Sequence, residues 1–255
     1  MNLDAIIIVL REVLEAAVLA SLLLALAQRL ALGRIWFWSS LSIGGVMAWL
    51  YADAIGWISE LWDYSGQEVL NATMQIAIFA AFCFLLFILR HADGRRGNLS
   101  AAAAVIIGLA LVRELSEILL YLQSYLVQDA NALPIILGSA VGFATGVSVG
   151  VMLYFVTLWV VDWQRAQTVI LSVLSVVVAG ILMQAVSLLM QVDRLPQVSA
   201  LWDTGDVIDE RSTLGQLLYA LIGYEATPTV WHMTVYVSAL LVMLFLMRSP
   251  KRVEL

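Results

Sequence analysis

The sequence has few of the residues on which disulfide-bonded proteins and many metalloproteins depend. It contains one cysteine, Cys83, and two histidines, His91 and His232, in 255 residues. A single thiol excludes an internal disulfide, a thiolate zinc site and an iron–sulfur cluster, because each of these needs several cysteines. The two histidines lie at the ends of different apolar segments, which argues against paired haem ligation inside a helical bundle and so against a membrane redox subunit.

Charged residues are scarce as well. They make up 13% of the chain, whereas 62% of its residues are hydrophobic. Soluble domains carry about 25% charged and about 45–50% apolar residues, so this composition is typical of a polytopic membrane protein. The net charge of −6 argues against nucleic-acid binding, which needs a basic surface. The sequence has no phosphate-binding Gly-rich loop with its lysine, so we expect no ATP hydrolysis and no enzyme activity.

Seven apolar segments approach the ~20 residues that a helix needs to cross about 30 Å of hydrocarbon. Helix is the expected spanning form, because the segments are far longer than barrel strands and do not alternate in polarity. The sequence therefore predicts an all-α integral membrane protein with seven transmembrane helices. The expected spans are 4–30, 35–58, 69–90, 100–126, 134–161, 167–191 and 230–247.

Basic residues alternate between the connections. They follow the first, third, fifth and seventh spans, whereas the other connections hold mainly acidic residues. Because basic residues stay on the cytoplasmic side, this pattern predicts an N-terminus outside and a C-terminus in the cytoplasm. The basic residues on the predicted cytoplasmic side are Arg29, Arg34, Arg90, Arg95, Arg96, Arg165, Arg248, Lys251 and Arg252, and those on the other side are Arg194 and Arg211.

Two Arg-Glu-x-x-Glu motifs interrupt the apolar segments. The first begins at Arg11 and the second at Arg113, 102 residues later. Each motif lies roughly in the middle third of its span, where one charge costs about 2.5–3.5 kcal/mol on insertion scales. Ionisable residues at this depth usually mark a substrate or ion pathway, which makes both motifs candidates for function.

A shift of 102 residues along the sequence aligns the first predicted span with the fourth. It predicts two three-helix repeats followed by a seventh helix, and an odd number of spans per repeat gives the repeats opposite orientations, as in many secondary transporters. The expected boundaries are 1–98 for the first repeat and 99–191 for the second, and 192–255 for an external loop, the seventh span and a cytoplasmic tail. The loop should hold a short helix over 214–222, capped by Thr213 and Gln216 and ended by Gly223.

The motif chemistry favours a cation site. The two glutamates of each motif share one helical face, and the arginine is four residues before the second glutamate, so we expect the pairs Arg11–Glu15 and Arg113–Glu117. Carboxylate oxygens suit hard cations, and the arginines reduce the net negative charge of the site. If the first and fourth spans face each other, the metal-binding carboxylates are Glu12, Glu15, Glu114 and Glu117.

Two alternatives use the same residues. The glutamates could carry another divalent cation or relay protons, or the motifs could form ion pairs that only fix helix packing. Spacing alone does not separate these readings.

Other residues are expected to support transport. Acidic residues in the outer connections attract cations toward the membrane, and Glu68 is favoured because it precedes the third span. A glycine at every fourth position of the fifth span lets another helix approach closely. The expected outer acids are Glu60, Asp63, Glu68, Asp203 and Asp206, and the glycines are Gly138, Gly142, Gly146 and Gly150.

The paired motifs resemble those of the oxidase-dependent ferric iron permease family, in which the motif is usually Arg-Glu-Gly-Leu-Glu in the first and fourth spans. The motif glycine is replaced here by Val13 and Leu115, and a bulkier residue there would hold the two helices further apart. The resemblance extends along most of the chain. Similar segments are Gly66-Gln67-Glu68, Gly215-Gln216-Leu217-Leu218 and Gly223-Tyr224-Glu225-Ala226-Thr227-Pro228.

The resemblance implies a seven-span permease that imports ferric iron through the four motif glutamates, with Arg11 and Arg113 tuning the site. Iron is then the transported substrate, and no permanently bound cofactor is expected. The resemblance also implies an external oxidase or peroxidase-like partner that supplies ferric ion. The compact loops, and a first apolar segment too long for a signal peptide, fit a multi-pass protein of a bacterial inner membrane.

Overall fold

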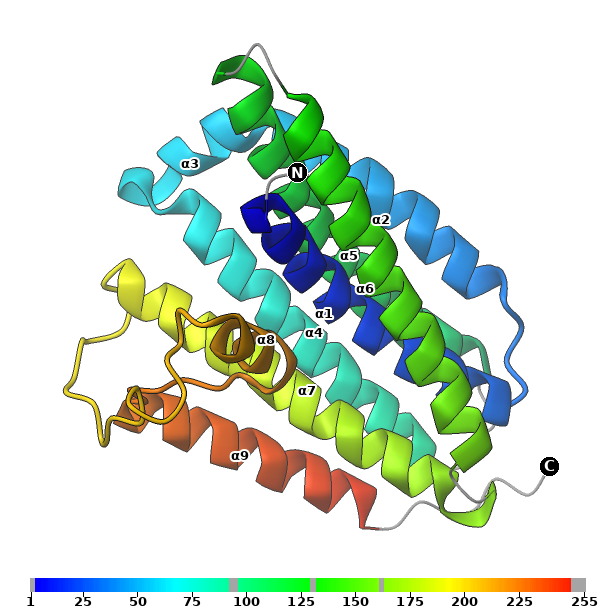
Figure 1. Ribbon diagram of the computed structural model, residues 1–255. Coiled ribbons are helices and arrows are strands. Elements are labelled where there is room, and N and C mark those ends of the chain that lie inside the picture. The colour runs from blue at the N-terminus through cyan, green and yellow to red at the C-terminus, as the bar shows by residue number, and fades with distance from the viewer. Residues whose placement is uncertain (1–2, 92–95, 129–131, 161–162, 249–255) are drawn as a thin grey trace.

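The computed structural model describes residues 3–91, 96–128, 132–160 and 163–248, which form a bundle of helices (Figure 1). Of the two short helices, α3 (Ile55–Tyr64) lies at one end of the bundle, and α8 (Thr213–Ile222) lies against its side, on α7 and α1. In the described ranges, the only β-type pairing is an isolated bridge between Ala200 and Thr229. The long helices are α1 (Leu3–Arg29), α2 (Ile35–Asp53), α4 (Gly66–His91), α5 (Arg96–Gln128), α6 (Leu133–Val160), α7 (Trp163–Gln191) and α9 (Val230–Met247).

Five of the long helices are long and apolar enough to cross a bilayer, namely α2, α4, α6, α7 and α9. The other two long helices, α1 and α5, are the ones that carry the charged motifs. The chain is therefore an all-helical, multi-pass membrane protein, as its composition predicts.

The second predicted span is wrong in length. We expected a helix over 35–58, but α2 ends at Asp53, and the chain turns at Ala54 into α3. The end of α3 unwinds, with left-handed backbone at Trp62, Asp63 and Tyr64. The turn from α3 into the next helix depends on Gly66, because a Cβ there would lie 1.8 Å from the carbonyl oxygen of Ile58. Hydropathy does not show the break, since the apolar run continues through it.

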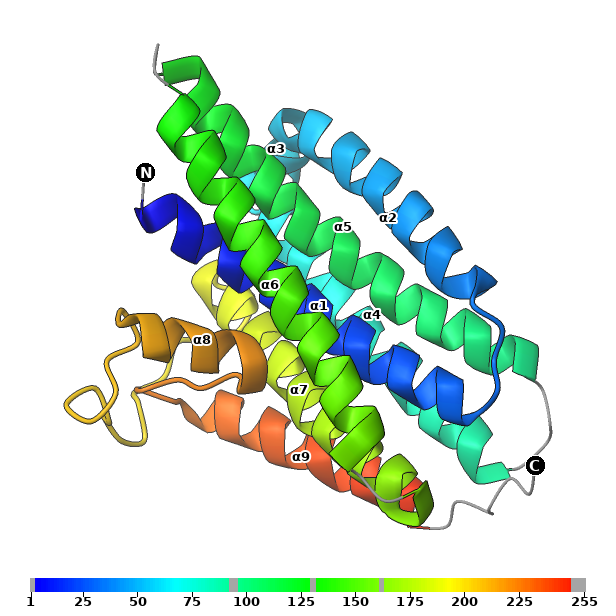
Figure 2. The same cartoon turned by 45° about the vertical axis from the view of Figure 1, so that its right-hand side comes forward.

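Each motif helix packs against a helix from the other half of the chain. Figures 1 and 2 show α1 running along α6 and α5 running along α2, with α4 and α7 side by side. The approach of α1 to α6 is close, since a Cβ on Gly142 would lie 2.5 Å from the carbonyl oxygen of Ile6. A Cβ on Gly146 would likewise lie 2.7 Å from Cγ1 of Val13. The tight packing predicted for the glycine stripe is therefore confirmed at these two positions.

An apolar core fills the half of the bundle toward the C-terminal end of α1. Large side chains from α1, α4, α5 and α7 are almost fully buried there. The charged motifs lie at the edge of this core, toward the end that holds α3. Core residues with at most 2% exposure include Leu19, Leu23, Phe82, Ile106 and Leu174.

The helix α8 packs onto α7 and α1 (Figure 2). It ends at Gly223, which has a left-handed backbone with φ of 69°. A Cβ on Gly180 of α7 would lie 2.5 Å from the carbonyl carbon of Ile222, so the backbones of α7 and α8 are in direct contact at this glycine. The predicted cap at Thr213 is wrong by one residue, because the Ser212 side chain accepts the hydrogen bond from the Gly215 amide.

Basic residues gather at the end of the bundle where α1, α4 and α9 end and α2 and α5 begin (Figure 1). Arg95, Lys251 and Arg252 lie outside the described residues, as does the side chain of Arg165. The basic residues placed at this end are Arg29, Arg34, Arg90, Arg96 and Arg248.

Candidate metal site

The motif carboxylates meet where α1 and α5 approach each other. Arg113 donates from Nε to Glu114 Oε1 at 2.7 Å, and its guanidinium also contacts Glu15 of α1. One carboxylate oxygen from each of Glu12, Glu114 and Glu117 lies within 4.8 Å of the others. The structure thus brings three carboxylates together and ties the fourth, Glu15, to the arginine beside them.

This cluster is almost fully buried. The exposed fractions are 2% for Glu12, 5% for Glu15, 3% for Glu114 and 5% for Arg113, while Glu117 is half-buried. Taking a charge out of water costs several kcal/mol per ion in proteins, so the carboxylates need compensating partners. Within the described structure, Oε2 of Glu114 has no hydrogen-bond partner. An unsatisfied carboxylate oxygen beside two other carboxylates is a position that a bound cation would satisfy.

The arginine partners differ from the prediction. We expected pairs four residues apart, but Arg11 contacts Glu12, and Arg113 contacts Glu114 and Glu15. A pair four residues apart runs along one helix surface, whereas Arg113 turns into the contact between α1 and α5, where it bonds a carboxylate of the other helix. The two arginines also differ in burial, because 32% of the Arg11 side chain is exposed and only 7% of the Arg113 side chain is.

Two glutamines extend the polar cluster and were not identified from the sequence. Gln184 of α7 accepts a hydrogen bond from Arg113 Nη1 at 2.7 Å and another from Gln75 Nε2 of α4 at 3.1 Å. Its own amide nitrogen donates to the carbonyl oxygen of Tyr219 at 3.2 Å. Both glutamines are at most 3% exposed. The signal was present in the sequence, since each is an isolated amide inside an apolar span.

The predicted outer acids are separated in the structure. Asp63 and Glu68 line a cavity of about 470 Å³ at the turn between α3 and α4, together with Asp193 and Arg194. The other three predicted outer acids, Glu60, Asp203 and Asp206, do not line this cavity. Glu60 is exposed on α3, and Asp203 and Asp206 are exposed in the loop before α8.

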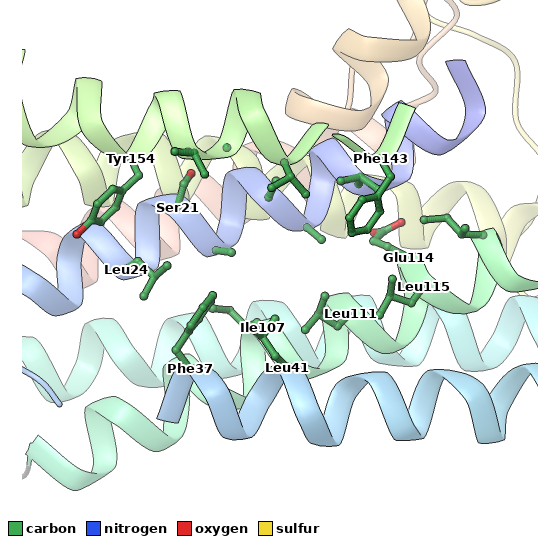
Figure 3. A pocket seen from close by; sticks show the side chains of 18 residues that line it. Ser21, Leu24, Phe37, Leu41, Ile107, Leu111, Glu114, Leu115, Phe143 and Tyr154 are labelled. Atoms are coloured by element: carbon green, nitrogen blue, oxygen red, sulfur yellow. The ribbon is translucent and has the colours of Figure 1, made fainter. Parts of the chain in front are cut away.

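An apolar cavity of about 420 Å³ lies on another side of the motif, among α1, α2, α5 and α6. Figure 3 shows Tyr154 at one end of it and Glu114 at the other, with Leu111 between them. Val13 and Leu115, which replace the motif glycine, both line this space. Their bulk is accommodated by the cavity and, for Val13, by Gly146 of α6.

Comparison with protein-family models gives a match over residues 67–250 with the model described as the Iron permease FTR1 family. The matched region contains the second motif and both buried glutamines. Comparisons with curated proteins and with solved structures find no match.

Proposed function

The chain belongs to the iron permease FTR1 family, and from this premise we propose that it imports ferric iron through the carboxylates of α1 and α5. The observation that carries the proposal is the convergence of Glu12, Glu114 and Glu117. Carboxylate oxygens are hard donors, and Coulomb attraction grows with the charge of the ion. With Arg11 and Arg113 beside four glutamates, the ionised site keeps a net charge of −2, which attracts a trivalent ion far more strongly than a monovalent one.

We also propose seven spans arranged as two inverted repeats, 1–98 and 99–191, with 192–255 as the added region. The packing of α1 on α6 and of α5 on α2 supports this, since exchanging the two halves leaves the pattern unchanged. The contact of α4 with α7 fits the same exchange. Inverted repeats place the substrate between the halves at mid-depth, and the motifs lie at such an interface.

For orientation, we propose an outer N-terminus and a cytoplasmic C-terminus in a bacterial inner membrane. The described arginines at one end of the bundle support this, since basic residues stay on the cytoplasmic side. The cavity with Asp63 and Glu68 is then on the outer side, where ferric ion from an external oxidase or peroxidase-like partner arrives. The buried apolar core lies between the site and the cytoplasm, so release requires the helices to move.

The test is metal uptake into vesicles that contain the purified protein, with ferric, ferrous, manganous and zinc ions compared with and without a proton gradient. We expect ferric iron to enter fastest. Glu114→Gln should abolish uptake, and the matched control Glu60→Gln, which changes an exposed glutamate outside the cluster, should retain most of it. Uptake of divalent ions as fast as that of ferric iron would favour a divalent-cation carrier. Full uptake by Glu114→Gln would indicate that the motifs only fix helix packing.

A further inference from the structure

A stripe of polar side chains runs along α4, from the cavity at the start of this helix into the bundle. Glu68, Asn71 and Gln75 are three and four residues apart, so they share one face of the helix. Glu68 lines the cavity of about 470 Å³, whereas Asn71 is 6% exposed and Gln75 is 1% exposed. Polar groups buried this deeply in a membrane bundle usually mark the pathway of a substrate or an ion.

Tyr51 of α2 connects the middle of the stripe with the motif on α5. Its hydroxyl group donates to Oδ1 of Asn71 at 3.1 Å. Gly44 of α2 packs on Leu111 of α5, since a Cβ on the glycine would lie 3.0 Å from the leucine Cβ. Because α2 and α5 begin at the same end of the bundle, Tyr51 lies two turns further along and level with Glu117. The Tyr51 hydroxyl group is near enough to Glu117 for the charge of that glutamate to act on it.

The inner end of the stripe holds an oxygen atom without a hydrogen-bond partner. Gln75 donates from Nε2 to Oε1 of Gln184 at 3.1 Å, and Arg113 donates to the same oxygen at 2.7 Å. Arginine has only donors, so the Gln184 atom that faces it must be the oxygen, and the Gln75 atom that faces this oxygen must be the nitrogen. The remaining atom of the Gln75 amide, Oε1, is buried and has no partner within the described structure.

The hydrogen bonds of Arg113 link this oxygen to a second one of the same kind. Arg113 also donates to Oε1 of Glu114, and Oε2 of Glu114 is the other unpartnered oxygen. A buried acceptor without a partner has lost its hydration and gained no bond in exchange. Amide and carboxylate oxygens are both ligands of hard cations, so a cation compensates both atoms.

We propose that the ferric ion reaches the motif along this stripe, from Glu68 past Asn71 to Gln75, and that Oε1 of Gln75 is a neutral ligand at the inner end. The inference rests on the proposed function, because it supplies the route to the same carboxylates. Neutral oxygens replace part of the water shell of the ion and hold it less tightly than carboxylates do. The ion therefore moves on to the motif glutamates, as conduction through a series of sites requires.

The first test asks whether the stripe admits cations, and it needs no iron. In a Cys83→Ala background, Asn71→Cys and Gln75→Cys place a thiol on the stripe. The matched control is Thr73→Cys, on the exposed face of the same helix. Silver ions are added on both sides of proteoliposomes for set times, the excess is removed, and the free thiols are counted with a fluorescent maleimide after denaturation.

The stripe thiols should react with silver faster than the control thiol by about tenfold or more, because the control faces hydrocarbon, which excludes charged species. Equal rates, or a faster reaction of the Thr73→Cys thiol, overturn the route whether or not the protein carries iron.

The second test measures how fast iron binds, by the quenching of tryptophan fluorescence after ferric citrate is mixed with the purified full chain. Gln75→Met keeps the length of the side chain and removes its oxygen. The binding rate should fall by about tenfold or more, as expected when a charged group loses one polar contact. The iron bound at saturation should stay the same, because the motif keeps its four glutamates.

The control is Thr73→Val, whose lost hydroxyl group bonds only the Val69 carbonyl oxygen of its own helix, and it should bind iron at the wild-type rate. An unchanged binding rate in Gln75→Met overturns the role of its oxygen while the proposed function stands. If the wild type binds no iron, the proposed function fails, and the silver reaction decides on the route by itself.

Discussion

At the scale of single residues, the two motif arginines occupy the same sequence context and different surroundings. Arg113 is buried and bonds Glu15, Glu114 and Gln184, whereas Arg11 contacts Glu12 and remains partly exposed. Removing one partner of a buried ion pair costs about 3–5 kcal/mol, because the other charge is left uncompensated. In the Arg11–Glu12 pair the glutamate is buried but the arginine is 32% exposed, so water compensates part of the arginine charge. The two arginines should therefore contribute unequally to folding.

This inequality gives the first prediction. Arg113→Gln should lower the free energy of unfolding by about 3–5 kcal/mol, since Glu15 and Glu114 lose their common partner. Arg11→Gln is the matched change in the other motif and should cost less, because Arg11 is partly exposed and bonds one glutamate instead of two. Thermal unfolding of the two purified variants in the same detergent measures the difference. Equal losses would show that the burial of Arg113 has no energetic consequence.

The second prediction concerns pH and Glu225. Its folded pKa of about 7 lies above the ordinary value of 4.5, so the folded protein binds this proton more tightly than the unfolded chain does. Below both values the group costs nothing, and stability falls as pH rises from about 4.5 to 7, by at most about 3 kcal/mol. Unfolding measured across this pH range should show a smaller decline in Glu225→Gln than in the wild type. Parallel pH profiles would contradict the raised pKa.

Residues of the candidate site were only partly predictable. The Arg-Glu-x-x-Glu spacing identifies the four glutamates, because ionisable residues in apolar spans stand out. The partners of each arginine depend on which faces of α1 and α5 are in contact, and the sequence of one helix does not determine this. Gln75 and Gln184 were missed because they carry no charge and belong to no repeated motif. Glu225 and His232 meet only because the segment after α8 folds back onto α7.

At the scale of elements, long apolar runs predict the helices well. The predicted span 230–247 has the same bounds as α9, and the ends of α1 and α6 differ from prediction by one residue. The break between α2 and α3 was missed, because apolar residues continue through Ala54, and the next turn, from α3 into α4, depends on the close contact of Gly66 with Ile58. Tertiary contacts therefore place the turns that hydropathy leaves open.

The third prediction tests the contact between α1 and α6. Gly142→Ala would place a Cβ 2.5 Å from the Ile6 carbonyl oxygen, so the helices must separate. Overpacking of this kind costs about 1–3 kcal/mol. The control is Gly45→Ala in α2, where a Cβ has open space and helix propensity should add up to about 1 kcal/mol. The midpoints of thermal unfolding should move in opposite directions, and a stabilised Gly142→Ala would contradict the close approach.

At the scale of the whole molecule, the polar cluster separates two unlike halves of the bundle. Toward the basic end, the bundle is filled by an apolar core that includes Leu19, Phe82 and Leu174. Toward α3 and α8, polar cavities contain Asp63, Glu68 and Glu225. This asymmetry fits the proposed carrier in a state that is closed at its basic end.

X-ray absorption at the iron edge tests the central claim most directly, on protein loaded with ferric iron and washed free of excess. We expect one iron per chain surrounded by oxygen ligands only, and loss of that iron when Glu12, Glu114 and Glu117 are replaced together by glutamine. Glu60→Gln should bind iron like the wild type. Iron retained by the triple variant with an unchanged spectrum, or a spectrum with sulfur ligands, would contradict a site built from the carboxylates of α1 and α5.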